Sequence, residues 1–245
     1  MTVHLIDHII VALLVVVLPI VDFFFLRERA AKIHAGQTEL RMKLYRTIIR
    51  QEWIGTIVIV AIWFALGRSA SELGLVPDFG AVAWAGYALT GVLLGLMYWQ
   101  LRSVTHHPEN HEAFRKKIGW LSFLTPHTKQ EVRAFNLLSV TAGVCEEIIF
   151  RGVLMAYLMS WLGVPFWGAA LLSSLGFGLA HMYQGPLGIP RVGFVGLGMA
   201  YLYGLTGSLW APIVVHAVMD LFAGWMSHAA FNSETPEDTS AKLAA

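Results

Sequence analysis

Residues 5–26 read LIDHIIVALLVVVLPIVDFFFL, an almost unbroken apolar run near the start of the chain. A helix over this run is long enough to cross the ~30 Å hydrocarbon core of a bilayer. No basic residue precedes the run, a basic loop follows it, and it is longer than the apolar part of a signal peptide. We therefore expect a first membrane-spanning helix whose N-terminus lies outside the cytoplasm.

The composition of the whole chain agrees with this expectation. Of 245 residues, 56% are apolar and only 13% are charged, whereas a soluble domain carries about 25% charged residues. The formal net charge of +1 gives no indication of a nucleic-acid partner. The single cysteine, Cys145, excludes an intrachain disulfide and a multi-cysteine metal cluster, and it is more typical of a packing residue than of a nucleophile.

Further apolar stretches predict an all-α, polytopic transmembrane bundle of about seven to eight helices with a buried polar site. The expected spans are 5–26, 53–67, 81–101, 134–160, 165–182, 192–208 and 209–228. The short apolar stretch 118–125 is the candidate for an eighth helix. We divide the chain into N-terminal helices with basic loops (1–133), a helical core that carries the site (134–231) and a polar, disordered tail (232–245).

Basic residues give the bundle an orientation. The loop 27–50 carries seven Lys or Arg residues and the segment 102–133 carries six, together thirteen of the seventeen in the chain. Both segments lie on one side if the two intervening helices each cross once, and the positive-inside rule makes that side cytoplasmic. Within the second segment, Phe114, Ile118 and Leu121 follow helical spacing, which fits a helix lying in the membrane interface as well as it fits a solvated loop.

Charged residues are rare between Ala134 and Asn232. There are five: Glu146, Glu147, Arg151, Arg191 and Asp220. Arg191 follows Pro190 in a predicted loop, but the other four lie in predicted helices. An ionised group at the bilayer centre costs at least ~2.5–3.5 kcal/mol, so such residues are normally paired and tied to function.

Three polar patterns follow one another in this region. In the first, Glu147 and Arg151 are four residues apart and can pair on one helical face, while Glu146 points about 100° away and suits a general base. A structural salt bridge would explain Glu147 and Arg151 but not Glu146. The other patterns are Phe177-x-x-x-His181 and His216-x-x-x-Asp220, in which the aspartate can orient the histidine or share a ligand role.

The three patterns come from successive helices and can meet at a similar depth. Only His181, near the cytoplasmic end of its span, is expected to lie shallower than the rest. The sequence has no HExxH metal-binding helix, no serine paired with a histidine and no aspartyl dyad. These observations favour an intramembrane endopeptidase. The alternatives are a non-catalytic immunity or scaffold protein that uses the same residues for packing, and a transporter, which should show repeats that this chain lacks.

The ordered set EExxxR, FxxxH and HxxxD, carried by Glu146-Glu147-Arg151, Phe177-His181 and His216-Asp220, resembles the CPBP family of membrane proteins. This family includes the CAAX prenyl endopeptidases and the bacteriocin-processing or immunity (Abi) proteins. The resemblance covers residues 134–228 and implies a bundle whose site opens toward the cytoplasm, in a bacterial or archaeal plasma membrane. It implies that Glu146 and His181 activate water, and that His216 and Asp220 form the oxyanion site.

Two further expectations concern the ligands of the site. The last motif position is often asparagine in the CAAX enzymes, so Asp220 must be protonated there or must orient His216 instead. Zinc is possible as a cofactor, with Glu146, His181 and His216 as candidate ligands, but the same residues can act without a metal. The expected partners are a membrane-associated protein or peptide substrate and the lipid bilayer, with no nucleic acid.

Overall fold

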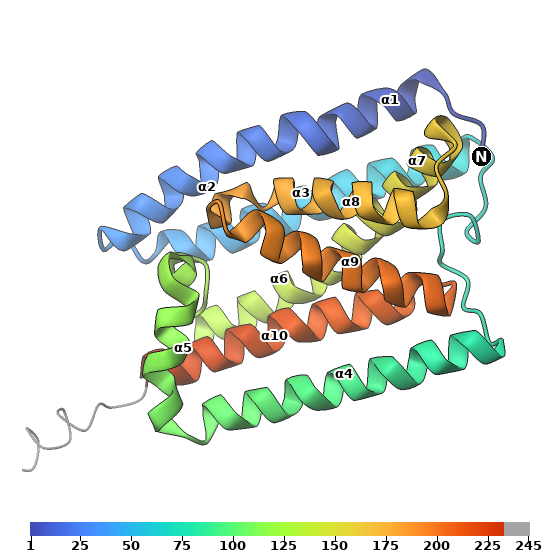
Figure 1. The fold of residues 1–245 in the computed structure, drawn as a ribbon. Helices are drawn as coiled ribbons and strands as arrows, with labels where there is room; N and C mark the ends of the chain where they lie inside the picture. The colour runs from blue at the N-terminus through green and yellow to red at the C-terminus, as the bar shows by residue number, and fades with distance from the viewer. Residues whose placement is uncertain (233–245) are drawn as a thin grey trace, which may run out of the picture.

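In the computed structural model, which describes residues 1–232, every regular element is a helix (Figure 1). The α-helices are α1 (Leu5–Ala12), α2 (Leu18–His34), α3 (Leu40–Ala65), α4 (Ala81–Thr105), α5 (His111–Ile118), α6 (Lys129–Glu147), α7 (Met155–Leu162), α8 (Phe166–Ala180), α9 (Gly188–Thr206) and α10 (Trp210–Asn232). Two π-helical segments are η1 (Leu13–Val17) and η4 (Ile148–Leu154), and three 3₁₀ turns are η2 (Pro108–Asn110), η3 (Gly119–Phe123) and η5 (Met182–Gln184).

The π-helical segments join their neighbours without a break, so α1–η1–α2 and α6–η4–α7 are continuous rods. With α3, α4, α8, α9 and α10 the described part of the chain contains seven long rods (Figure 1). Each rod overlaps one predicted span, which confirms the all-α bundle. The stretch 118–125 is not a further span, because α5 and η3 are short and lie across one end of the bundle.

Four helices of the described chain are long and apolar enough to cross a membrane by length and composition: Leu5–His34, Leu40–Ala65, Ala81–Thr105 and Trp210–Asn232. The first three bury few of their side chains within the protein. Large apolar side chains such as Ile57 and Trp84 are exposed on them. This arrangement suits lipid as the surrounding solvent, because lipid satisfies apolar surface that water would not.

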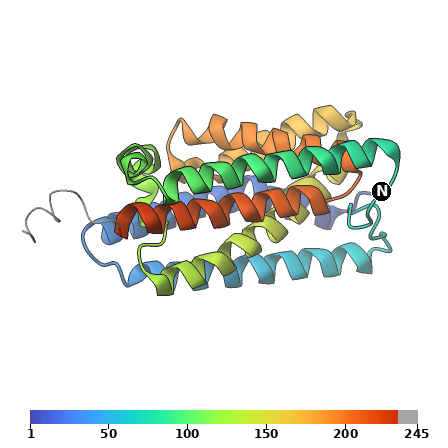
Figure 2. The same ribbon diagram turned by 90° about the horizontal axis from the view of Figure 1, so that it is seen from below.

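The rods that carry the polar motifs lie toward the middle of the bundle. Figure 2 shows α10 between α4 and α6, and α3 packs on the other side of α6. The helix α6 begins with a capping box in which the Thr128 hydroxyl accepts from the Glu131 backbone and the Glu131 carboxylate accepts from the Thr128 backbone. This cap determines where α6 begins, and the helical turn from that point determines the direction in which Glu146 projects.

Two expected boundaries differ from the structure. The second span was expected at 53–67, but α3 already begins at Leu40. No proline or glycine interrupts residues 40–54, and Arg41 is buried in an ion pair with Glu131 of α6 at 2.7 Å, so the basic stretch continues the helix rather than forming a loop. Of the predicted tail 232–245, only Asn232 lies within the described residues.

The α6–α10 crossing depends on a glycine. A Cβ added at Gly143 would lie 2.7 Å from the Ala217 backbone nitrogen and 2.8 Å from the Ala217 Cβ. Small residues allow this approach of two helix backbones. The crossing lies one turn from Glu146 on α6 and next to His216 on α10, so it sets how close the two motifs come.

We expect Gly143→Ala to destabilise the protein by about 1–3 kcal/mol, because α6 and α10 must move apart to admit the methyl group. Thermal unfolding of the purified protein in detergent measures the effect. The control is Gly95→Ala on α4, where an added Cβ meets no atom within 4 Å. Equal melting temperatures for the two variants would contradict the close crossing.

Candidate active site

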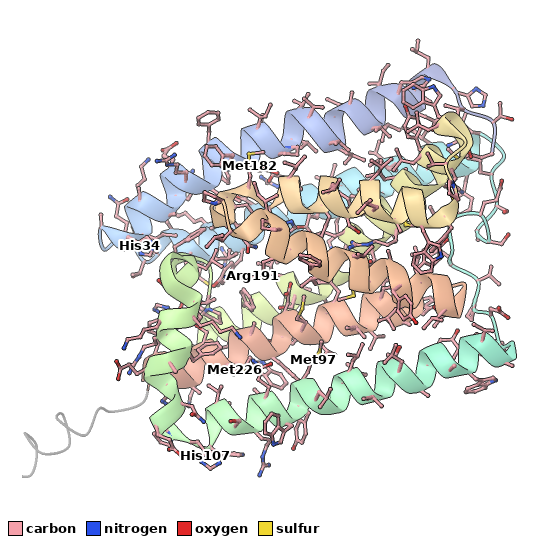
Figure 3. All side chains as sticks on the ribbon, in the orientation of Figure 1. His34, Met97, His107, Met182, Arg191 and Met226 are labelled. Atoms are coloured by element: carbon pink, nitrogen blue, oxygen red, sulfur yellow. The ribbon has the colours of Figure 1, made fainter. Side chains whose placement is uncertain are left out.

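The position of His181 follows from the length of α8. This helix has 15 residues and is therefore about 22 Å long, shorter than the ~30 Å apolar core. His181 is the residue that ends the helix, and it lies inside the bundle rather than at its tip. The next residue, Met182, lies beside α2 (Figure 3). The expectation that His181 would be shallower than its partners was wrong, because the chain turns before α8 reaches the end of the bundle.

A buried carboxylate, Glu147, links the first and third motifs. Its Oε1 accepts a hydrogen bond from Arg151 Nη1 at 3.0 Å and lies 2.8 Å from His216 Nδ1. The side chains of Glu147 and Arg151 are both fully buried. The ion pair suggested by the i, i+4 spacing is therefore present, and the same carboxylate also holds the ring of His216. This second contact joins α6 to α10, and it could not be predicted from the spacing of residues within one helix.

The Arg151 guanidinium is enclosed by two further helices. Its Nη2 donates to the Gly196 carbonyl on α9 at 3.0 Å, and its Cζ lies 4.4 Å from the centre of the Phe177 ring on α8. A Cβ at Gly196 would lie 2.8 Å from that Nη2. Glycine is therefore needed here because the guanidinium occupies the space that a side chain would take.

The π-helical segment η4 starts directly after Glu147 and contains Arg151. A π-helix disturbs the regular backbone hydrogen bonds of an α-helix and is often found at functional sites. Here Ser173 of α8 donates a 2.6 Å hydrogen bond to the Phe150 carbonyl, so a neighbouring helix satisfies part of the distorted backbone. All seven residues of η4 are buried.

Glu146 lies beside the two motif histidines, His181 after α8 and His216 of α10. Its Oε2 lies 3.9 Å from His181 Nε2 and 3.8 Å from His216 Nε2, and it is buried without a hydrogen-bond partner. These distances are too long for direct hydrogen bonds but suit one bridging water. The arrangement thus gathers one carboxylate oxygen and two imidazole nitrogens around a common point.

The two histidine rings are oriented by different partners. His181 Nδ1 lies 2.8 Å from the Phe177 carbonyl, and His216 Nδ1 lies 2.8 Å from the Glu147 carboxylate. Both partners accept hydrogen bonds, so each Nδ1 carries the proton and each Nε2 is directed at the space beside Glu146. Phe177 also contacts the His216 ring edge to face, with ring centres 6.0 Å apart.

Asp220 lies at the edge of the same group. Its Oδ2 is 3.8 Å from His216 Nε2, and its side chain is 34% exposed, the most of the six predicted site residues that form ion-pair contacts. Asp220 therefore makes no direct hydrogen bond to the histidine that it was expected to orient, and Glu147 occupies that position.

The structure also allows a test of the zinc hypothesis. In residues 1–232, no group of three or more His, Cys, Asp or Glu side chains is arranged to hold a metal ion. Glu146, His181 and His216 lie close together, but they do not have the arrangement of a metal-binding group.

Two acidic residues that the motifs did not reveal lie close to this group. Glu52 of α3 interacts electrostatically with Glu146, His216 and Asp220. Asp22 of α2 interacts electrostatically with His181 and Glu52. Both are acids within a membrane-spanning helix, and such residues can be taken as candidate site residues from the sequence alone. Glu52 was not recognised as one because the expected span began at residue 53.

Comparison with known proteins agrees with the motifs. Residues 128–222, fewer than half of the chain, match the family model described as "Type II CAAX prenyl endopeptidase Rce1-like". All six predicted site residues lie inside this match. The match supports the resemblance of this segment to the CPBP family. Together, the match and the apolar helices of the fold indicate an integral membrane protein.

A relative is also found among curated proteins. The chain is 33% identical over 84 residues to a protein of Bacillus subtilis (strain 168) named "Putative membrane peptidase YdiL". The aligned region is 34% of this chain and 33% of that protein, so the similarity spans about a third of the relative's length. No solved structure matches the chain.

We expect Arg151→Met to destabilise the protein by about 3–5 kcal/mol, because it leaves the buried Glu147 carboxylate without its cation. The matched control is Lys116→Met, which breaks the exposed i, i+4 pair with Glu112 and should leave the melting temperature unchanged within error. Thermal unfolding in detergent distinguishes the two. Equally small losses would show that the buried pair contributes little to the fold.

Proposed function

We propose that this chain is an intramembrane endopeptidase that hydrolyses a peptide bond of a membrane-associated protein or peptide, with Glu146 as the base that activates water. The observation that carries the proposal is the convergence of His181 Nε2 and His216 Nε2 on the unpartnered Oε2 of Glu146, at 3.9 and 3.8 Å. A water between these atoms has three polar partners, which is what an ordered internal water requires.

In the proposed reaction, the water gives a proton to Glu146 while its oxygen attacks the scissile carbonyl carbon. The carbonyl π electrons move to oxygen and give a tetrahedral oxyanion. When this intermediate collapses, the carbon–nitrogen bond breaks and the proton passes from Glu146 to the leaving amine. The products are a new carboxyl terminus and a new amino terminus. His181, fixed by the Phe177 carbonyl, assists by orienting the water.

His216 is the proposed oxyanion partner. Its Nδ1–H is held by the Glu147 carboxylate, which favours a positively charged ring when negative charge develops nearby. Such a ring donates from Nε2 toward the substrate oxygen. Glu147 and Arg151 thus serve to hold His216, and Asp220, at the exposed edge, lies where it can contact the substrate or the ring only through a water.

A groove beside His181 offers a route for the substrate. It has a volume of about 650 Å³ and lies between α2 and the turn η5, with Phe23, Ala30, Met182 and Tyr183 among its walls. The Tyr183 ring is 5.7 Å from the His181 ring. The apolar walls support a substrate segment that is itself apolar, as expected for a chain associated with the bilayer.

We propose that the site opens toward the cytoplasm of a bacterial or archaeal cell. His34, the last residue of α2, and His107, in the turn after α4, lie at the same end of the bundle (Figure 3). The two basic segments that contain them carry most of the Lys and Arg residues, and the positive-inside rule places such segments in the cytoplasm. His181 ends α8 on the side facing this end.

A non-catalytic packing network is the competing interpretation. It explains Glu147, Arg151 and His216, whose polar atoms contact one another directly. It gives no reason why His181 Nε2 and His216 Nε2 both lie near Glu146 Oε2, at 3.9 and 3.8 Å, without a direct hydrogen bond to it. This convergence favours the enzyme over the scaffold.

We expect Glu146→Gln and His181→Ala each to lower peptide cleavage about 10²–10⁴-fold, because each removes a group that handles the water. The substrate is found by quantitative proteomics, as a membrane-associated protein that accumulates uncleaved when Glu146→Gln replaces the wild-type chain. Cleavage of a quenched fluorescent peptide copied from it gives the rates.

The controls are Glu109→Gln and His106→Ala, which make the same changes at exposed positions outside the site. They should cleave the peptide at the wild-type rate. Normal cleavage by both Glu146→Gln and His181→Ala would refute the proposed function.

A further inference from the structure

Among the helices that precede the family match, α3 carries one acid that differs from its neighbours. Two buried acids that flank this part of the bundle are paired with arginine: Asp7 of α1 with Arg68 at 2.6 Å, and Glu131 of α6 with Arg41 of α3 at 2.7 Å. Glu52 makes no ion pair within the described residues, and its Oε2 is buried without a hydrogen-bond partner. It lies near the middle of α3, far from either helix end.

The surroundings of Glu52 are the groups of the proposed site. It interacts electrostatically with Glu146, His216, Asp220 and Asp22. Cys145, the residue before Glu146, interacts electrostatically with Glu52 and Glu146. Three of the four strongest neighbours are acids and none is a lysine or arginine, so the position of Glu52 is not explained by charge pairing.

The helix that bears Glu52 is fixed against α6. The indole of Trp53 donates a 3.0 Å hydrogen bond to the Thr141 hydroxyl of α6, one residue along from Glu52. One turn after Glu52, Thr56 is buried on the same face of α3. Thr56 also interacts with Cys145 of α6, so the face of α3 that carries Glu52 and Thr56 is turned toward the α6 motif.

Such a group costs stability. A buried polar oxygen without a partner loses its hydration and regains nothing in return, and nearby acids add repulsion. Side chains that break the rules of packing in this way are typically found at functional sites. A second carboxylate beside the proposed site can accept a hydrogen bond from the attacking water in addition to those made to Glu146 and His181.

We infer that Glu52 is a positioning residue of this active site, whose unpartnered carboxylate oxygen orients the water that Glu146 activates. The inference rests on the proposed function and adds to it a residue that lies outside the segment matched by the family. It assigns α3 a part in the reaction besides its part in the fold.

The test compares Glu52→Gln and Glu52→Met with the wild type, using the purified full chain and the same quenched fluorescent peptide. We expect kcat to fall about 10–100-fold with KM changed less than twofold, because the water is misplaced while the substrate still binds. We also expect Tm to stay the same or to rise by about 2–4 °C, because the unpaired buried acid is gone.

The matched control is Glu39→Gln, the same substitution at the exposed residue that precedes the same helix. It should leave kcat, KM and Tm unchanged. A wild-type kcat for both Glu52 variants would overturn the inference. A loss of kcat accompanied by a fall in Tm of several degrees would also overturn it, since that combination indicates a structural role.

Failure of this inference is distinct from failure of the proposed function. If Glu146→Gln is inactive in the same assay while both Glu52 variants are fully active, the enzyme stands and the role of Glu52 is refuted. If Glu146→Gln and His181→Ala both cleave normally, the proposed function and the inference that rests on it are both refuted. The effect of Glu52→Gln on Tm needs no substrate, so a clear drop in Tm is decisive in either case.

Discussion

The arrangement of this bundle depends on one buried carboxylate oxygen, Oε1 of Glu147. It receives the Arg151 guanidinium from its own rod and the His216 ring from α10. Through Arg151 the same contact reaches the Gly196 carbonyl of α9 and the Phe177 ring of α8. Because an unpaired charge in a low-dielectric interior is costly, the four helices must come together for any of these groups to be buried. A polar interaction thus fixes the relative positions of helices whose apolar surfaces alone would allow many packings.

Much of this could be predicted from the sequence, because the signals were local. Apolar runs indicated seven rods, and the i, i+4 spacing of Glu147 and Arg151 indicated an ion pair on one helix face. The contacts between helices could not be predicted in the same way. The spacing of His216 and Asp220 suggested that the aspartate orients the ring, whereas the Glu147 carboxylate from another helix lies closer, at 2.8 Å against 3.8 Å. Distances between residues of two helices depend on where the two backbones meet. The spacing of residues within one helix does not predict that position.

The same limit explains what was missed in the N-terminal half. Hydropathy placed the start of the second span at residue 53, since the preceding residues are rich in Lys and Arg. In the structure those residues continue α3, and Arg41 is buried against Glu131 of α6. A basic residue that finds an acid inside the protein behaves as an interior residue, which composition alone cannot reveal. Helices α2 and α3 thereby bring Asp22 and Glu52 next to a cluster that the sequence motifs assign wholly to the C-terminal half.

The early end of α8 has a consequence for how such a site meets its surroundings. Because the helix stops after 15 residues, the turn η5 lies against α2 instead of at the tip of the bundle. His181, at the end of α8, thereby comes within 3.9 Å of Glu146 instead of lying beyond it at the tip of the bundle. For the proposed peptidase, the early turn would place the water-activating groups nearer to one membrane face than to the other. That face would then supply the water and receive the new polar chain ends.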